Sequence, residues 1–196
     1  MDFAAAIVWA AGGQVDGVPK NENPAGIINM SLGTQSRCNA TFSDAVAEAR
    51  KLGSILVAAA GNSNKGADWT APGNCEDLIT VGATGPSGKR ASYSNYGPGV
   101  ELAAPGGDNW AVDWLDERGW SINPIDEWKI ISTVDEGLQG SQGPGYAIQE
   151  GTSQATPLVA GAVALARQAN PEITQEEVLA ALQKSATPFS EKDPNK

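Results

Sequence analysis

The stretch SILVAAA at residues 54–60 is a continuous apolar run, and Gly61 and Asn62 follow it at once. An apolar run of this length without polar alternation is typical of a strand that is buried on both faces of a parallel sheet. Residues 78–83 (LITVGA) predict a second strand of the same kind, and residues 26–31 (GIINMS) predict a short strand earlier in the chain. These runs indicate a mainly parallel sheet.

Helical patterns alternate with these strands. Residues 3–12 end at a Gly pair, and residues 41–52 carry apolar side chains at helical spacing before Gly53. Residues 152–169 are mostly small or apolar, and residues 174–184 begin with a capping-box pattern. Further β-type patches lie at residues 91–104 and 128–134. The alternation predicts an α/β layer fold.

The composition limits the chemistry. The chain has 196 residues, 41% hydrophobic and 18% charged, which fits one globular domain. It contains no His, so it cannot by itself supply a Ser-His-Asp triad or a His-ligated metal. Its formal charge of -10 disfavours nucleic acid as a partner. No apolar run reaches the roughly 20 residues that cross a bilayer, which argues against a membrane span.

Two further patterns carry little functional weight. Residues 107–128 hold four of the six Trp and six acidic residues, which predicts a surface insertion rather than a calcium loop built from Asp108, Asp113, Asp116 and Asp126. Residues 83–90 are a poor phosphate loop, because Ala replaces the first Gly and Arg replaces the magnesium-binding Ser or Thr. The two cysteines leave a disulfide or a reduced pair open.

Two polar residues stand where chemistry is expected. Ser153 lies at the start of the predicted helix 152–169, where free N–H groups can stabilise negative charge, and Pro157 breaks a helix rule nearby. Asn62 directly follows a strand, at the sheet edge where ligands bind in parallel α/β folds. Each residue also has a structural interpretation. Thr152 or Ser153 could simply cap the helix, and Gly61-Asn62 could simply form a turn. When each motif is considered by itself, the structural interpretation is favoured.

Five motifs in order resemble those of the subtilisin-like serine peptidases, the subtilases, and most of all those of secreted bacterial members. GTSQATPLVAG at 151–161 is similar to the nucleophile motif GTSMATPHVAG, AAAGN at 58–62 to the oxyanion segment, and INMSLG at 28–33 to the cleft segment. TVGAT, ASYSNYG and AAPG follow between residues 80 and 106 in the family's order. The resemblance covers about residues 3–189 and implies a three-layer α/β/α fold.

The resemblance implies a role for each matching position. Ser153 would be the nucleophile, and Asn62 with the backbone N–H of Ser153 would form the oxyanion hole. An extended substrate would pair with one edge of the cleft and place a medium or large apolar side chain in the primary pocket. The edge residues would be Ser31, Leu32 and Gly33, and the pocket wall Ala59, Ala60 and Gly61. The resemblance also favours a disulfide between Cys38 and Cys75.

The sequence departs from the family in what it lacks. The motifs that carry the catalytic Asp and the catalytic His are absent, so residues 1–196 are interpreted as the C-terminal portion of one catalytic domain whose first strands are missing. Gln154 replaces the usual Met and Leu158 the usual, non-catalytic His. Gln154 adjoins the nucleophile, so it is expected to affect rate or leaving-group preference.

The leading hypothesis is a secreted serine endopeptidase that acts on polypeptides and is inactive as this chain alone. Its partners would be the substrate and the absent N-terminal segment, and its export signal would lie outside this sequence. No cofactor is needed for the chemistry, and a structural calcium stays open. The alternative is a catalytically inactive pseudo-peptidase that binds peptides. A nucleotide-binding domain is disfavoured because no competent phosphate loop is present.

Overall fold

Four parallel strands form the central sheet of the computed structural model, which describes residues 2–108, 114–115, 121–122, 128–137 and 139–189. The strands lie side by side in chain order, as β1 (Ile27–Met30), β2 (Ile55–Ala59), β3 (Ile79–Thr84) and β4 (Leu102–Pro105). Because all four run in the same direction, the loops that follow them meet at one edge of the sheet.

Strand β2 explains why its sequence shows no alternation. Every residue of Ile55–Ala59 is buried. Ile55 and Val57 pack into one core, and Leu56 and Ala58 pack into the core on the opposite face. Both faces of β2 are therefore covered, as the apolar run predicted.

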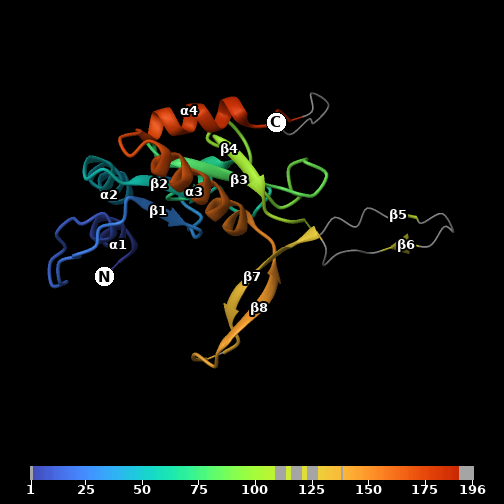
Figure 1. The fold of residues 1–196 in the computed structure, drawn as a ribbon, viewed down its shortest axis with the longest axis horizontal. Helices are drawn as coiled ribbons and strands as arrows, with labels where there is room; N and C mark the ends of the chain where they lie inside the picture. Colours follow the sequence, from blue (N-terminus) through green and yellow to red (C-terminus); the bar gives the residue numbers. More distant parts are fainter. Residues whose placement is uncertain (1, 109–113, 116–120, 123–127, 138, 190–196) are drawn as a thin grey trace.

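Helices cover both faces of the sheet and complete three layers (Figure 1). One face packs against α1 (Phe3–Ala10) and α2 (Ala40–Lys51), whose N-cap is Asn39. The other face packs against α3 (Thr152–Ala169) and α4 (Gln175–Ser185). The predicted capping box of α4 is present, with Thr174 and Glu177 bonded reciprocally. The α/β fold class is confirmed.

Two antiparallel pairs lie outside the central sheet. Strands β7 (Ile130–Asp135) and β8 (Pro144–Gln149) form a hairpin that leads into α3. Strands β5 (Trp114–Leu115) and β6 (Ser121–Ile122) pair within the predicted insertion at 107–128, most of which lies outside the described residues. Asp113, Asp116 and Asp126 are among the residues that the structure does not describe.

The β-type prediction at residues 91–104 was wrong over most of its length, because only residues 102–104 fall in β4. Side chains in the preceding stretch bond to the backbone and hold it in turns. Ser94 Oγ accepts the Ala83 N–H at 2.9 Å and donates to the Asn95 carbonyl at 2.9 Å. Such local bonding competes with strand pairing. The short 3-10 helix η1 (Ala67–Trp69) lies in the connection between β2 and β3.

Candidate active site

Ser153 lies in the first turn of α3, where it faces the end of β1. Its Oγ donates to the Ser31 carbonyl at 2.8 Å, and Ser31 Oγ donates to the Ser153 carbonyl at 2.8 Å. The N-cap residue of α3 is Gly151, and no side chain caps the helix. The hydroxyl groups of Thr152 and Ser153 are therefore used for contacts across the site and not for the helix cap.

Asn62 is held by its carbonyl oxygen. Asn62 Oδ1 accepts the Thr152 backbone N–H at 2.9 Å and the Thr152 hydroxyl at 2.7 Å. The same hydroxyl accepts the Gly61 N–H at 3.2 Å, and Thr152 is fully buried. Asn62 is exposed, and within the described residues its Nδ2 has no hydrogen-bond acceptor.

Two N–H donors meet beside Gly151. A Cβ placed on this glycine would lie 2.9 Å from Gln154 Oε1, 3.2 Å from Asn62 Nδ2 and 3.5 Å from the Ser153 backbone nitrogen. The φ angle of Gly151 is 147°, which L side chains rarely adopt. A glycine is needed at this position both for its backbone and because a Cβ would crowd Gln154 Oε1 and Asn62 Nδ2. The Ser153 N–H belongs to the first turn of a helix, where amides lack intrahelical partners.

A pocket of about 340 Å³ opens next to these groups. Of the predicted residues, Leu32, Gly33, Ala59, Gly61, Asn62 and Ser153 line it. The structure places Ser31 against Ser153, outside this lining, and buries Ala60 completely. The sequence did not predict the other lining residues, which are Thr34, Gln35, Ser63, Thr70 and Thr152. Of these, all but Thr70 adjoin a predicted segment, because Thr34 and Gln35 follow the cleft segment, Ser63 follows Asn62 and Thr152 precedes Ser153.

One hydrogen bond joins two residues of the pocket lining. Gln35 Nε2 donates to Ser63 Oγ at 3.2 Å and so connects the loop after β1 with the loop after β2. A second cavity of about 380 Å³ is lined by Gln35, Ser63 and Thr70 as well, and Trp69 forms another part of its wall. The Gln35–Ser63 contact therefore lies where the two spaces adjoin.

The loop that carries Asn62 is fixed by a buried amide. Asn95 Oδ1 accepts the N–H groups of Ser63 at 3.0 Å and Lys65 at 3.1 Å. Its Nδ2 donates to the Ala60 carbonyl at 2.8 Å and to the Thr70 hydroxyl at 3.0 Å. Asn95 is 2% exposed, so all of these bonds are made in the interior. Its supporting role was not predicted, because a single Asn in a turn gives no signal in sequence.

Two glycines join the site to its surroundings. The Gly151 N–H donates to the Gly106 carbonyl at 2.9 Å. The Tyr93 hydroxyl is 2.8 Å from the Gly106 carbonyl and 2.7 Å from the Gly107 carbonyl. Burial raises the pKa of Tyr93, so its hydroxyl keeps the proton that it donates here. The hydrogen bond between Gly151 and Gly106 fixes the start of α3 to the end of β4.

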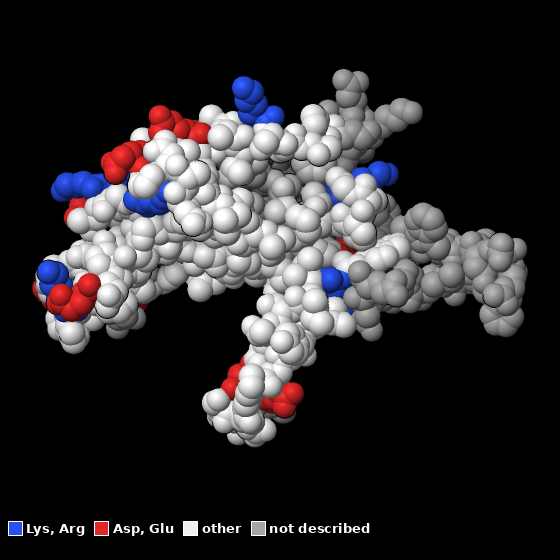
Figure 2. Space-filling view, in the orientation of Figure 1, with Lys and Arg blue, Asp and Glu red and all other residues white. Residues whose placement is uncertain are grey.

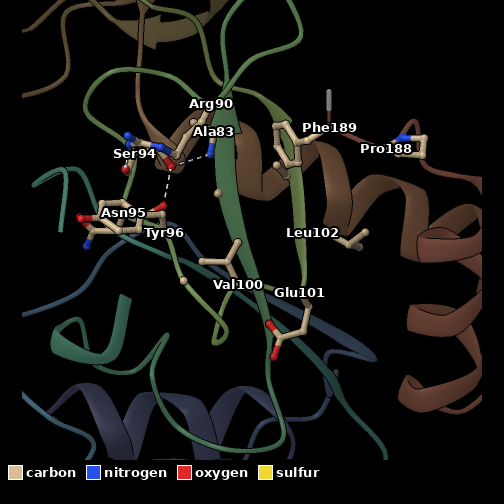
Figure 3. Close-up of a pocket in the computed structure, with 13 residues that line it drawn as sticks. Ala83, Arg90, Ser94, Asn95, Tyr96, Val100, Glu101, Leu102, Pro188 and Phe189 are labelled. Carbon is tan, nitrogen blue, oxygen red and sulfur yellow. Dashed lines mark hydrogen bonds between the residues drawn. The ribbon is translucent and has the colours of Figure 1, made fainter. Parts of the chain in front are cut away.

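A separate cavity of about 350 Å³ lies on β3 and β4 and contains none of the predicted site residues. Arg90 lies toward one end and Glu101 toward the other, with Tyr96, Val100 and Phe189 among the walls (Figure 3). Burial raises the pKa of Glu101, which accepts the Thr80 N–H at 2.7 Å. This cavity is distinct from the pocket at Ser153.

The described part of the chain offers little for a metal ion. It contains no group of three or more His, Cys, Asp or Glu side chains that could hold one. Asp108 is buried and accepts the Ser92 N–H at 2.9 Å and the Ser92 hydroxyl at 2.7 Å.

Cys38 and Cys75 are joined in a disulfide, with their Cα atoms 5.1 Å apart. None of the described helices is both long enough and apolar enough to cross a membrane.

Comparisons with known proteins identify extracellular proteases among the relatives of this chain. The chain is 40% identical over 164 residues to the extracellular basic protease of Dichelobacter nodosus, covering 84% of this chain and 24% of that protein. It is 40% identical over 170 residues to an extracellular protease of Xanthomonas campestris pv. campestris, covering 87% of this chain and 26% of that protein. This chain therefore spans about a quarter of the length of both relatives.

A solved structure confirms the fold. A protease from Pseudoalteromonas arctica PAMC 21717 superposes with a TM-score of 0.83 at 38% identity, over 95% of this chain and 51% of that chain. The sequence model described as the subtilase family matches residues 1–196. The ordered motifs, the three-layer fold and these matches show that the chain belongs to the subtilase family.

Proposed function

We propose that this chain is the C-terminal portion of a secreted serine endopeptidase, with Ser153 as the nucleophile. The observation that carries the proposal is that Asn62 Nδ2 and the Ser153 N–H both lie beside Gly151, two residues before Ser153 in the chain. Donors fixed in advance around a point where negative charge develops are the main electrostatic means of catalysing acyl transfer. The names of two relatives, both called extracellular, support secretion.

In the proposed reaction, Ser153 Oγ attacks the carbonyl carbon of the scissile peptide bond. Its proton passes to a His that an N-terminal segment supplies, and an Asp on that segment orients the His. The developing oxyanion accepts hydrogen bonds from Asn62 Nδ2 and the Ser153 N–H. The protonated His then donates its proton to the leaving amine, and water hydrolyses the acyl-enzyme.

This chain alone has no group that can take the proton. It contains no His, and the Ser153 hydroxyl donates to the Ser31 carbonyl, which is not a general base. We therefore expect no hydrolysis by the isolated chain. Substrate would lie along Ser31, Leu32 and Gly33 and place one side chain in the 340 Å³ pocket.

The test uses a completed domain, meaning this chain together with an N-terminal subtilase segment that carries an Asp and a His. Hydrolysis of a fluorogenic peptide should appear only in the completed domain, and Ser153→Ala should abolish it. Ser63→Ala, a matched control in the same pocket, should retain activity. If the completed domain hydrolyses peptide equally well with Ser153→Ala, then Ser153 is not the nucleophile.

A peptide-binding pseudo-peptidase is the second candidate, and the lack of His is the observation that favours it. The two functions differ in one result. A completed domain that binds peptide at the pocket and leaves it intact would support the pseudo-peptidase and refute the endopeptidase.

A further inference from the structure

The cavity that adjoins the pocket at Ser153 differs from it in charge. The two spaces share Gln35, Ser63 and Thr70 as lining residues. Among the described residues, none that lines the pocket is charged, whereas the adjoining cavity has one charged lining residue, Lys65. We call this space of about 380 Å³ the Lys65 cavity. A side chain that extends through the pocket past Gln35 and Ser63 therefore approaches a cation.

The backbone of Lys65 is fixed beside the pocket. Its N–H donates to Asn95 Oδ1 at 3.1 Å, and its carbonyl accepts the Tyr96 N–H at 3.0 Å. The same Asn95 oxygen accepts the Ser63 N–H at 3.0 Å, so Ser63 and Lys65 are held by one buried side chain. The residue itself is exposed, and a lysine ammonium on its four-carbon stem can turn toward a ligand.

Lys65 stands out in an acidic chain because it has no acidic neighbour at ion-pair distance. The chain has a formal charge of -10. On the face that Figure 2 shows, basic and acidic side chains are mixed over α2 and α4, and the hairpin tip with Asp135 and Glu136 carries acidic side chains. Both ion pairs among the described residues involve α2, and Lys65 belongs to neither. Its ammonium is thus available to an anionic ligand.

A second cation lies close to the Lys65 cavity. The Arg37 guanidinium carbon is 4.9 Å from the centre of the Trp69 ring, and Trp69 lines the cavity. One acidic residue, Asp68, lies in the same loop, where its carboxylate is placed against Gly66. Asp68 does not line the cavity. Two cations against one anion make this side of the pocket electropositive, which favours a negatively charged substrate group.

We propose that Lys65 is a specificity-determining residue that selects substrates with glutamate before the scissile bond. The inference rests on the proposed function, in which the substrate places this side chain in the pocket. The two methylene groups of glutamate pass the uncharged lining, and the carboxylate accepts a hydrogen bond from the Lys65 ammonium. An apolar side chain of medium size stays in the pocket and does not need Lys65. Aspartate is one methylene shorter and stops before the cation.

The test compares fluorogenic peptides that differ only in the residue before the scissile bond. Glutamate and glutamine have the same shape, so the ratio of their kcat/KM values isolates the effect of charge. For the completed domain at low ionic strength this ratio should be about three- to fivefold in favour of glutamate, as expected of an exposed ion pair. It should fall toward one in 1 M NaCl. The ratio of aspartate to asparagine should stay below twofold.

Four variants isolate the contribution of Lys65. Lys65→Gln should lower the glutamate-to-glutamine ratio to about one, Lys65→Glu should bring it below one, and Lys65→Arg should retain it within twofold. The matched control is Lys20→Gln, which removes the same charge from the loop before β1, at the opposite edge of the sheet. It should keep the parent ratio. Because Lys65 and Lys20 are exposed, all four variants should keep the parent melting temperature.

A binding measurement separates failure of this inference from failure of the proposed function. Peptide amides that end in glutamate or glutamine are titrated into the completed domain carrying Ser153→Ala. The glutamate amide should bind at least threefold more tightly, and adding Lys65→Gln should remove the difference.

Each outcome decides between the two proposals. Hydrolysis of both peptides at equal kcat/KM, or a preference for glutamate that Lys65→Gln leaves unchanged, would overturn the role of Lys65 and leave the endopeptidase intact. Binding that depends on Lys65, without hydrolysis of any peptide, would refute the endopeptidase and support the acidic specificity of the cavity. Neither binding nor hydrolysis would overturn both.

Discussion

Replacing Thr152 by Val should impair catalysis through Asn62. The Thr152 hydroxyl makes one of the two hydrogen bonds to Asn62 Oδ1, at 2.7 Å, and also accepts the Gly61 N–H at 3.2 Å. Val keeps the shape and removes both bonds. Asn62 Oδ1 then accepts only the Thr152 backbone N–H, so the side-chain amide can rotate more freely and its Nδ2 is less well positioned to donate to the oxyanion.

The size of the effect can be estimated from these bonds. One hydrogen bond contributes about 1 kcal/mol, and each 1.4 kcal/mol is about tenfold in rate, so kcat of the completed domain should fall about five- to tenfold with little change in KM. Asn62→Ala should cost about 10²–10³ in kcat, a figure that comes from subtilisin, a member of the same family. The half-buried Gly61 N–H left without its partner should also reduce the free energy of unfolding by about 1 kcal/mol.

A double-mutant cycle separates positioning from general damage. Thr152→Ser keeps the hydroxyl and should retain kcat within about threefold. If Thr152 acts through Asn62, adding Thr152→Val to Asn62→Ala should lower kcat little further. The assay is hydrolysis of a fluorogenic peptide by the completed domain, and urea unfolding of each variant measures stability. A full additional five- to tenfold loss in the double variant would refute this reasoning.

Three further predictions concern the pocket, the disulfide and the hairpin tip. Gln35→Ala shortens a side chain of the pocket lining and removes its bond to Ser63, and should raise kcat/KM several-fold for substrates with larger side chains in a peptide series; an unchanged profile would contradict this. Replacing Cys38 and Cys75 by Ser opens a loop with a sequence separation of 37 residues and should cost about 4 kcal/mol of unfolding free energy in urea, with reductant lowering only the parent to the same value. The hydrogen bonds at the tip lower the pKa of Asp135 to about 2. The carboxylate therefore stabilises the tip fully above about pH 4 and loses that effect as pH falls through 2, so the protection factors of the Gly137 and Gln142 amides, measured against unstructured peptides at the same pH, should fall there and should not change with pH in Asp135→Asn.

The sequence predicts most of the core but not all of the cleft. Strong local signals mark two strands and one helix. Burial on both faces dictates the apolar composition of the strands Ile55–Ala59 and Ile79–Thr84, and one apolar side dictates that of the helix Thr152–Ala169. The positions of Ser153 and Asn62 follow from those elements. Strand β8 has no such signal, since Tyr146 and Ile148 point away from the core of this chain.

The parts of the site that could not be predicted depend on contacts between distant segments. Gln35 and Ser63 meet across 28 residues of sequence, and Asn95 supports a loop that ends about 30 residues earlier. Thr152 was considered as a helix cap, yet its hydroxyl bonds to Asn62, 90 residues away. Pairings of this kind depend on the folded sheet, which brings the loops after β1 and β2 to one edge.

The Gly106–Gly151 contact has a consequence for how such a protein can change. The Gly151–Gly106 hydrogen bond joins the two ends of the segment between β4 and α3. A Cβ on Gly106 would lie 2.5 Å from the Ala83 Cβ, so position 106 admits no larger residue. The backbone bond holds the first turn of α3 at the end of β4 whatever the length of the chain between them. We therefore expect changes of length in the insertion at residues 107–128, which lies outside the β7–β8 hairpin, to leave Ser153 in place.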